Sequence, residues 1–228
     1  QRQASRKELN ILIKYSKFII TTNDYLKSKI DKKYQYKVIL MPTTDKDMLV
    51  PNLSKQNNKR LITYKNGIHL IWIGTSFNLH NLISVISYLD KAAYTLKISL
   101  KKSLILTVIC DTPLKTRTKH LIIKNIKWSR KNAKIEVLNA HIGIMPLLNN
   151  KYNKGKASFK LIQYLSAGLP VIGSNVGFNS KVINNKNGVL VNNKETEWIN
   201  AILLLSQSDD IWQTYSKNAF ASWEKNFN

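Results

Sequence analysis

The chain of 228 residues suits one large domain, or one domain and part of another, and its 43% hydrophobic content is enough to build a core. Its net charge of +23 invites a nucleic-acid interpretation, but 31 of its 36 basic residues are Lys and only 5 are Arg. Recognition of bases and phosphates draws heavily on Arg, and these lysines are spread along a chain rich in Asn and Ile, so we disfavour nucleic acid as a partner.

Cysteine content and apolar runs predict a cytoplasmic location. No apolar run approaches the roughly 18 residues of a membrane-spanning helix, and no signal peptide is visible. The single Cys110 excludes an internal disulfide and is interpreted as a small core residue, which fits a reducing compartment. The positive charge would also suit peripheral contact with an anionic membrane. Because the chain begins with Gln1 rather than Met, we expect a piece of a longer protein.

The first fifty residues predict a partial α/β unit with alternating helices and strands. The expected elements are a helix over Lys7–Ser16, a strand over Phe18–Ile20, a helix over Asp24–Lys32 and a strand over Val38–Leu40. The following stretch from Pro51 to Arg60 is rich in Asn, Lys, Ser and Gln, and we interpret residues 51–67 as a linker.

From residue 68 to residue 228, short apolar strands alternate with amphipathic helices, which predicts a doubly wound parallel sheet. Strands are expected at His69–Ile73, Leu104–Ile109, Asn125–Trp128, Ile142–Met145, Pro170–Gly173 and Val189–Val191. Helices are expected near Asn81–Leu89, Lys131–Asn139, Ser158–Ala167, Asn179–Ile183, Thr196–Leu205 and Asp209–Lys225. Ligands bind such folds beyond the carboxyl ends of the strands, where the strand order reverses. The segments Gly74–Ser76, Trp128–Ser129, Pro146–Lys156 and Gly173–Phe178 are therefore expected on one rim.

The most informative segment is Lys154–Gly173, in which a basic loop enters an amphipathic helix. Lys156, Lys160 and Gln163 have the i, i+4, i+7 spacing of one helical face. Two ammonium groups beside a helix N-terminus would form a phosphate site, with Gln163 within reach of a sugar hydroxyl. A surface helix with two solvated lysines would show the same spacing, so the spacing alone leaves both interpretations open.

This segment resembles the donor-binding motif of family 4 glycosyltransferases of the GT-B type, in the subset with Gly-Lys-x-x-x-Lys-Leu-x-x-Tyr followed by Ala-Gly-x-Pro-Val. Further matches follow in the family's order. Leu70–Thr75 resembles its first strand and glycine turn, and Trp128-Ser129 with Glu136 resembles its Trp-Ser…Glu element. Ile142–Leu147 resembles its Asp-Ile-Gly-Ile-Met-Pro-Leu strand, and Asn187–Val191 with Glu197-Trp198 resembles its Asn-Gly-Phe-Leu…Glu-Glu-Trp region. The resemblance implies a Rossmann-like C-terminal domain over residues 68–228, preceded over residues 1–50 by the tail end of the acceptor-side N-terminal domain.

The resemblance also implies a donor site for a nucleoside diphosphate sugar, without a cofactor or metal. The donor diphosphate would be bound by Gly74, Thr75, Ser76, Lys156, Ser158 and Lys160. The ribose and base would be bound by Gln163, Trp128 and Glu136. No catalytic residue is assigned. Structural interpretations compete at several positions, since Gly74 suits a tight turn, a Trp at a strand end is usually core, and Glu136 suits a cap or a surface acid.

Two departures from the family pattern affect this site. The wider family has two glutamates eight positions apart around the donor helix, where this chain has Gly155 and Gln163. Gln163 can still bind ribose, but as a neutral and weaker acceptor. Many members also carry a basic residue near the helix after the glycine turn, where this chain has only Asn78 and His80, which shifts the expected diphosphate contacts toward Lys156 and Lys160.

These implications predict the donor-binding part of a retaining glycosyltransferase of the hexosyltransferase type, acting on a glycan or lipid-linked acceptor in polysaccharide biosynthesis. Most of the acceptor-binding domain would be missing, so we expect the chain alone to be inactive. One alternative is a sugar-nucleotide epimerase of the same architecture, which would need several acidic groups and a histidine around the sugar. The other is a non-catalytic module that binds nucleotides or nucleic acid.

Overall fold

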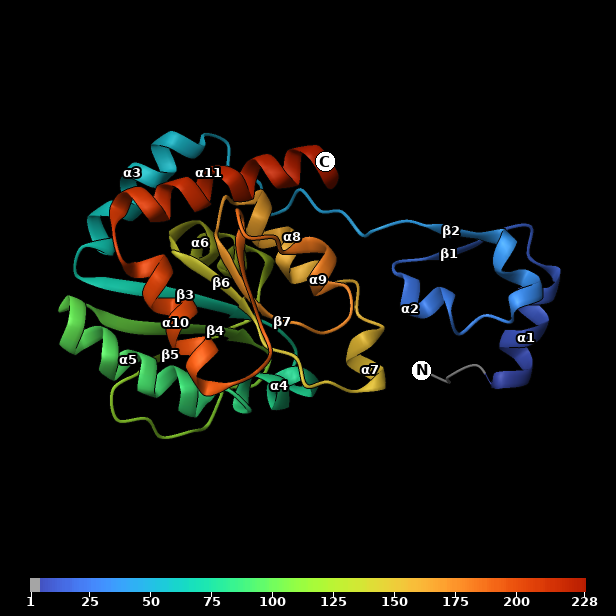
Figure 1. Ribbon diagram of the computed structural model, residues 1–228, viewed down its shortest axis with the longest axis horizontal. Coiled ribbons are helices and arrows are strands. Elements are labelled where there is room, and N and C mark those ends of the chain that lie inside the picture. The colour runs from blue at the N-terminus through green and yellow to red at the C-terminus, as the bar shows by residue number, and fades with distance from the viewer. Residues whose placement is uncertain (1–4) are drawn as a thin grey trace.

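The computed structural model describes residues 5–228 and shows a six-stranded sheet domain joined to a small N-terminal unit (Figure 1). All neighbouring strands are parallel, in the order β5-β4-β3-β6-β7-β8. The strands are β3 (Gly67–Ile73), β4 (Ser103–Cys110), β5 (Ile122–Lys127), β6 (Ile142–Met145), β7 (Val171–Ser174) and β8 (Gly188–Val191). The strand order reverses between β3 and β6, which confirms the predicted doubly wound sheet.

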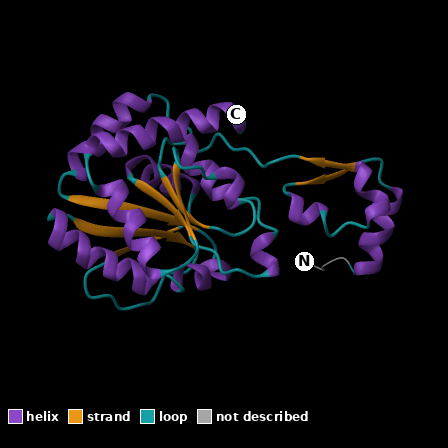
Figure 2. Cartoon of the chain, in the orientation of Figure 1, coloured by secondary structure: helices purple, strands orange, loops and turns teal. Residues whose placement is uncertain are grey.

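Helices cover both faces of this sheet (Figure 2). They are α3 (Leu53–Tyr64), η2 (Ser76–Asn78), α4 (Leu79–Ile83), α5 (Ile86–Leu100), α6 (Arg130–Asn139), α7 (Lys151–Lys154), α8 (Phe159–Ser166), α9 (Asn179–Val182), α10 (Glu195–Ser206) and α11 (Asp209–Asn226). Along β3, Leu70 and Trp72 join the core beneath α5 and α10, whereas Ile71 and Ile73 join the core beneath α6 and α8. Burial on both faces explains why the central strands are continuous apolar runs rather than alternating ones.

Most of the segment predicted as a linker is not an irregular connection, because it forms helix α3. The buried side chains of this helix are Asn57, Arg60 and Tyr64, which share one face. The Arg60 guanidinium donates to the carbonyls of Leu138 at 2.8 Å and Ala167 at 3.0 Å, so α3 is joined to the C-terminal ends of α6 and α8. The helix is therefore part of the sheet domain.

The N-terminal unit follows the predicted order of helices and strands. Its elements are α1 (Arg6–Tyr15), β1 (Ile19–Thr21), α2 (Asp24–Lys27), the 3-10 helix η1 (Lys32–Lys37) and β2 (Val38–Leu40). Strands β1 and β2 form a separate parallel pair. Residues 1–4 of the predicted unit 1–50 lie outside the described residues. The predicted helix over Asp24–Lys32 is shorter than expected and is followed by η1, and the predicted helix over Asn81–Leu89 is divided into α4 and α5.

Residues 41–50, which we call the connecting segment, run from β2 to the sheet domain (Figure 1). Met48 and Val50 are buried against that domain, and the Val50 N–H donates to the Ser166 carbonyl at 3.2 Å. The Thr44 hydroxyl donates to the carbonyl of Phe227, just after α11. The connecting segment is thus held against α8 and the C-terminal end of α11. In the described part of the chain, no helix is long and apolar enough to cross a bilayer.

Candidate functional site

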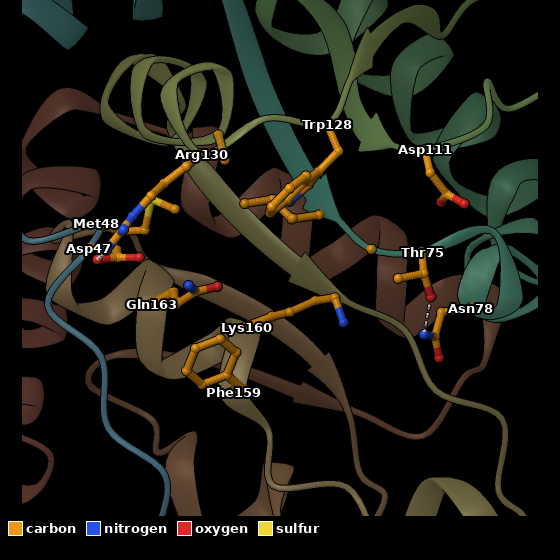
Figure 3. A pocket seen from close by; sticks show the side chains of 13 residues that line it. Asp47, Met48, Thr75, Asn78, Asp111, Trp128, Arg130, Phe159, Lys160 and Gln163 are labelled. Atoms are coloured by element: carbon orange, nitrogen blue, oxygen red, sulfur yellow. Dashed lines mark hydrogen bonds and ion pairs between the residues drawn. The ribbon is translucent and has the colours of Figure 1, made fainter. Parts of the chain in front are cut away.

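A cavity of about 560 Å³ opens at the carboxyl ends of β3, β4 and β5, beside the start of α8 (Figure 3). This volume is in the range of small-ligand sites. Its lining comes from the turns after β3 and β4, from the start of α6, from α8 and from the connecting segment. The residues that line it are Asp47, Met48, Ile73, Gly74, Thr75, Asn78, Asp111, Trp128, Arg130, Ala133, Phe159, Lys160 and Gln163.

Two lysines define the cationic end of the cavity. Lys160 points into the cavity from the first turn of α8 (Figure 3), and its ammonium lies 6.0 Å from the ring centroid of Trp72. Lys156 lies just outside the lining, and its ammonium donates to the Asn78 side-chain oxygen at 2.6 Å. Burial lowers the pKa of Lys160, and burial together with the nearby Lys160 charge lowers the pKa of Lys156 to about 8. Within the described residues neither lysine has a carboxylate partner, so an anion here would be bound favourably.

The turn after β3 brings fewer polar groups to the cavity than its sequence suggested. Gly74 lies against the Trp72 ring, where an added Cβ would approach a ring carbon to 2.1 Å, and its N–H donates to the Ile109 carbonyl. Ser76 does not line the cavity, because its N–H and hydroxyl both donate to Asp111, at 2.6 and 2.9 Å. The hydrogen bond from the Cys110 thiol, followed by these two from Ser76, lowers the pKa of Asp111. The hydroxyl of Thr75 faces the cavity and accepts a hydrogen bond from Asn78.

Ser158, at the start of α8, is buried and does not line the cavity. Its backbone has a positive φ of 54°, and its hydroxyl donates to the Asn179 side chain at 2.7 Å. The helix therefore has no side-chain cap, which leaves its first N–H groups for solvent or a ligand. Ser158 shapes the helix start but its side chain faces α9 rather than the cavity.

The opposite end of the cavity combines a flat aromatic surface with polar groups. Trp128 is 55% exposed rather than part of the core, and it projects from the end of β5 into the cavity wall (Figure 3). Arg130 forms an ion pair with Asp47, which lowers the pKa of that carboxyl. An exposed indole beside paired charges is suited to a planar heterocycle with hydrogen-bonding edges.

Gln163 lies on the floor of the cavity, whereas Glu136 lies elsewhere. Gln163 is only 8% exposed, and its amide nitrogen donates to Asp45 of the connecting segment at 2.5 Å. Glu136 does not line the cavity; it pairs with Lys124 of β5 at 3.1 Å. Because α6 buries Ala133 and not Glu136, the acid faces the edge strand, and the structure does not bring the predicted ribose or base contact Glu136 to the cavity.

The structure therefore brings together Gly74, Thr75, Trp128, Lys160 and Gln163, with Lys156 adjacent, and leaves Ser76, Ser158 and Glu136 outside the lining.

Sequence reasoning missed Asp45, Asp47, Asp111 and Arg130. Asp111 follows a predicted strand almost directly, and that position was a usable signal. The aspartates of the connecting segment carry no periodic signal, because only the crossing of this segment over α8 brings them to the cavity.

Histidines and metal-type clusters do not contribute to this cavity. The described residues that line it include no histidine. His141 is fully buried within the sheet domain, where its ring accepts a hydrogen bond from the His69 N–H at 2.9 Å and burial lowers its pKa to about 3. In the part of the chain that the structure describes, no three His, Cys, Asp or Glu side chains gather as metal ligands.

Comparison with known proteins shows the family. Residues 69–208 match the family described as Glycosyl transferases group 1. No curated protein sequence matches this chain significantly.

Solved structures share its fold at low sequence identity. Sucrose-phosphate synthase from Thermosynechococcus elongatus is 13% identical, with a TM-score of 0.65, over 97% of this chain and 57% of that one. Anabaena Alr3699/HepE, solved in complex with UDP and glucose, is 12% identical, with a TM-score of 0.65, over 98% of this chain and 62% of that one. The C-terminal domain of the group 1 family protein LpcC from Francisella tularensis is 14% identical, with a TM-score of 0.55, over 79% of this chain and 95% of that domain. The chain thus spans little more than half of the two longer proteins, and the GT-B fold that the sequence predicted is confirmed.

Proposed function

The chain belongs to the glycosyl transferases group 1 family, and we propose that it is the part of such an enzyme that binds the nucleoside diphosphate sugar donor. The observation that carries this proposal is the cavity at the strand-order reversal, with Lys156 and Lys160 at one end and Trp128 at the other. The diphosphate would lie at the lysines and at the uncapped start of α8, and the nucleoside would lie toward Trp128 and Gln163.

The proposed chemistry is transfer of a hexosyl group, with retention of configuration, to a glycan or lipid-linked acceptor in polysaccharide biosynthesis. The nucleoside diphosphate sugar is the substrate, and no cofactor takes part. Negative charge develops on the departing diphosphate in the transition state, and Lys156 and Lys160 would stabilise that charge. The acceptor would bind a further domain of the same enzyme, at the cytoplasmic face of a membrane, so this chain alone would bind donor without transferring sugar.

Calorimetric titration of the 228-residue chain with UDP, GDP and ADP tests donor binding. We expect at least one of them to bind with a Kd between about 1 μM and 1 mM, on the order of −4 to −8 kcal/mol. A single-stranded oligonucleotide is the comparison ligand, and its binding should weaken steeply with added salt if it binds at all. If all three nucleoside diphosphates fail to bind at millimolar concentration, the proposal is wrong.

Alanine variants of the two lysines test where the diphosphate lies. Lys156→Ala and Lys160→Ala should each weaken nucleoside diphosphate binding by about 1.5–3 kcal/mol, because each removes a charged hydrogen-bond donor. Lys151→Ala is the matched control, since Lys151 is exposed on α7, outside the cavity. Unchanged binding in both test variants would instead assign the phosphates to the turn at Gly74 and Thr75.

A further inference from the structure

The amide of Gln163 is held in one orientation by a carboxylate that comes from outside the sheet domain. Its nitrogen donates to Asp45 of the connecting segment at 2.5 Å. A carboxylate at neutral pH only accepts hydrogen bonds, so the amide must present its nitrogen to Asp45. Figure 3 shows the consequence: the nitrogen of Gln163 faces the connecting segment and the oxygen faces Lys160 across the cavity floor.

The oxygen of this amide is an unused acceptor in a nearly closed position. Gln163 is 8% exposed, and within the described residues no donor bonds to its Oε1. The other carboxylates beside the cavity are occupied: Asp47 pairs with Arg130, and both oxygens of Asp111 accept from Ser76. The Gln163 oxygen is thus an acceptor on the cavity floor that no donor of the described residues occupies, and a ligand that satisfies it must bring a hydroxyl or N–H donor.

We propose that Asp45 is a positioning residue that makes Gln163 the acceptor for the ribose diol of the donor nucleotide. The inference rests on the proposed function, because it assumes that a nucleotide occupies this cavity. The carboxylate fixes the amide so that its oxygen faces the ribose hydroxyls. The charge-assisted N–H···O⁻ bond also polarises the amide and strengthens its oxygen as an acceptor. The pair Asp45–Gln163 thus supplies a negative acceptor from two residues on separate segments.

The alternative role for Asp45 is to fasten the connecting segment. The connecting segment has other attachments, at Thr44, Asp47 and Val50. A fastening role would affect all nucleotides equally, whether or not they carry the ribose hydroxyls. Discrimination between ribose and deoxyribose is therefore the measurement that separates the two roles.

The test compares a nucleoside diphosphate with its 2′-deoxy and 3′-deoxy analogues by calorimetry on the full chain, using whichever of UDP, GDP and ADP binds. The parent should prefer the ribonucleotide to one of the deoxy analogues by about tenfold, the value of a hydrogen bond to a charge-assisted acceptor. Asp45→Asn should reduce this preference to near unity while leaving the affinity for that deoxy analogue about the same.

Exchanging the amide and the carboxylate between positions 45 and 163 should restore the ribose preference, which a fastening role for Asp45 does not predict. Gln163→Glu alone should also lose the preference, since two carboxylates would then face each other. The double variant Asp45→Asn/Gln163→Glu restores one amide and one carboxylate and should recover most of the preference. Asp210→Asn, which removes an exposed carboxylate on α11, is the control for net charge.

The outcomes separate this inference from the proposed function. Failure of every nucleoside diphosphate to bind overturns both. Binding with no ribose preference in the parent, or an undiminished preference in Asp45→Asn, overturns the role of Asp45 and Gln163 and leaves donor binding standing. Loss of the preference in each single variant with recovery in the double variant supports the inference.

Discussion

Lys156 and Lys160 are two cations held at one end of a cavity without a counter-ion among the described residues. Burial makes protonation of both less favourable, and the Lys160 charge adds to this effect at Lys156, which is also bonded to Asn78 in the turn after β3. Their arrangement costs stability in the empty protein. That cost is recovered when an anion binds, which is the pattern expected of a ligand site rather than of a solvated surface helix.

The lowered pKa of Lys156 gives a pH prediction with opposite signs for binding and for stability. Nucleoside diphosphate affinity should fall as the pH rises above about 8, because the empty site then loses the Lys156 proton that the phosphates require. The contribution of this group to the free energy of unfolding should instead increase as the pH rises. Between about 8 and the ordinary value of 10.5 the unfolded chain holds this proton and the folded chain does not, so this group favours folding more as the pH rises.

Calorimetry and urea denaturation at pH 7, 8, 9 and about 10 measure these two quantities. Lys156→Ala should lose the pH dependence of binding between pH 8 and 9 and keep only what the remaining groups contribute. An affinity of the parent protein that stays constant up to pH 10 would contradict the assignment of Lys156 to the phosphate site.

At the level of elements, the strands were predictable and helix α3 was not. Strands such as β6 are apolar throughout because both faces are buried, so composition alone marks them. Besides Tyr64, helix α3 buries the polar side chains of Asn57 and Arg60, and hydrogen bonds from Arg60 to backbone carbonyls take the place of part of an apolar stripe. The apolar periodicity of this segment is therefore weak, and the segment is easily interpreted as a linker.

The site was predictable to the extent that it lies on regular elements. Lys160 and Gln163 share a helical face in the sequence and share the cavity in the structure, because α8 is a regular helix over that stretch. Asp45 reaches Gln163 only through the path of the connecting segment, which no local pattern encodes. Glu136 lies outside the cavity for a different reason: its helix was expected, but the side of the helix that faces β5 was not predicted.

Tyr164 joins helix α8 to the strand that leads into the site, and its removal should measure that connection. Its hydroxyl accepts a hydrogen bond from the Ile73 N–H at 3.0 Å, and the side chain is fully buried. Tyr164→Phe should lower the free energy of unfolding by about 1–3 kcal/mol, because a buried N–H loses its partner. Urea denaturation measures the change, and Tyr36→Phe, at an exposed tyrosine of η1, is the control. Equal stability of Tyr164→Phe and the parent would mean that this hydrogen bond does not hold α8 to β3.

For the molecule as a whole, the cavity lies between the sheet domain and the connecting segment, and the N-terminal unit contacts the loop next to it. The connecting segment supplies Asp47 and Met48 to the cavity wall. The N-terminal unit reaches the loop that carries Lys156, because the Asn23 side chain donates to the Lys156 carbonyl at 3.1 Å. Movement of the N-terminal unit would therefore shift the loop that carries Lys156, at the cationic end of the site.

The N-terminal unit should be the least stable part of the described chain, because its two short strands bury little apolar surface. Phe18 and Ile20 are 58% and 59% exposed, whereas Ile142 and Ile144 of β6 are fully buried. An isolated pair of strands without a covered apolar face is marginally stable in water. Native-state hydrogen exchange should therefore show weak protection of amides in β1 and β2 and strong protection in β6, which serves as the internal reference.

Weak protection of β1 and β2 would fit a unit whose exposed apolar side chains pack against the rest of an acceptor-binding domain in the whole enzyme. Protection equal to that of β6 would show that residues 5–228 unfold as one cooperative domain. The exposed side chains of β1 and β2 would then belong to a surface that is stable by itself. In that case the proposal that sugar transfer needs a further domain built on this unit would lose its physical basis, whereas donor binding at Lys156 and Lys160 would be unaffected.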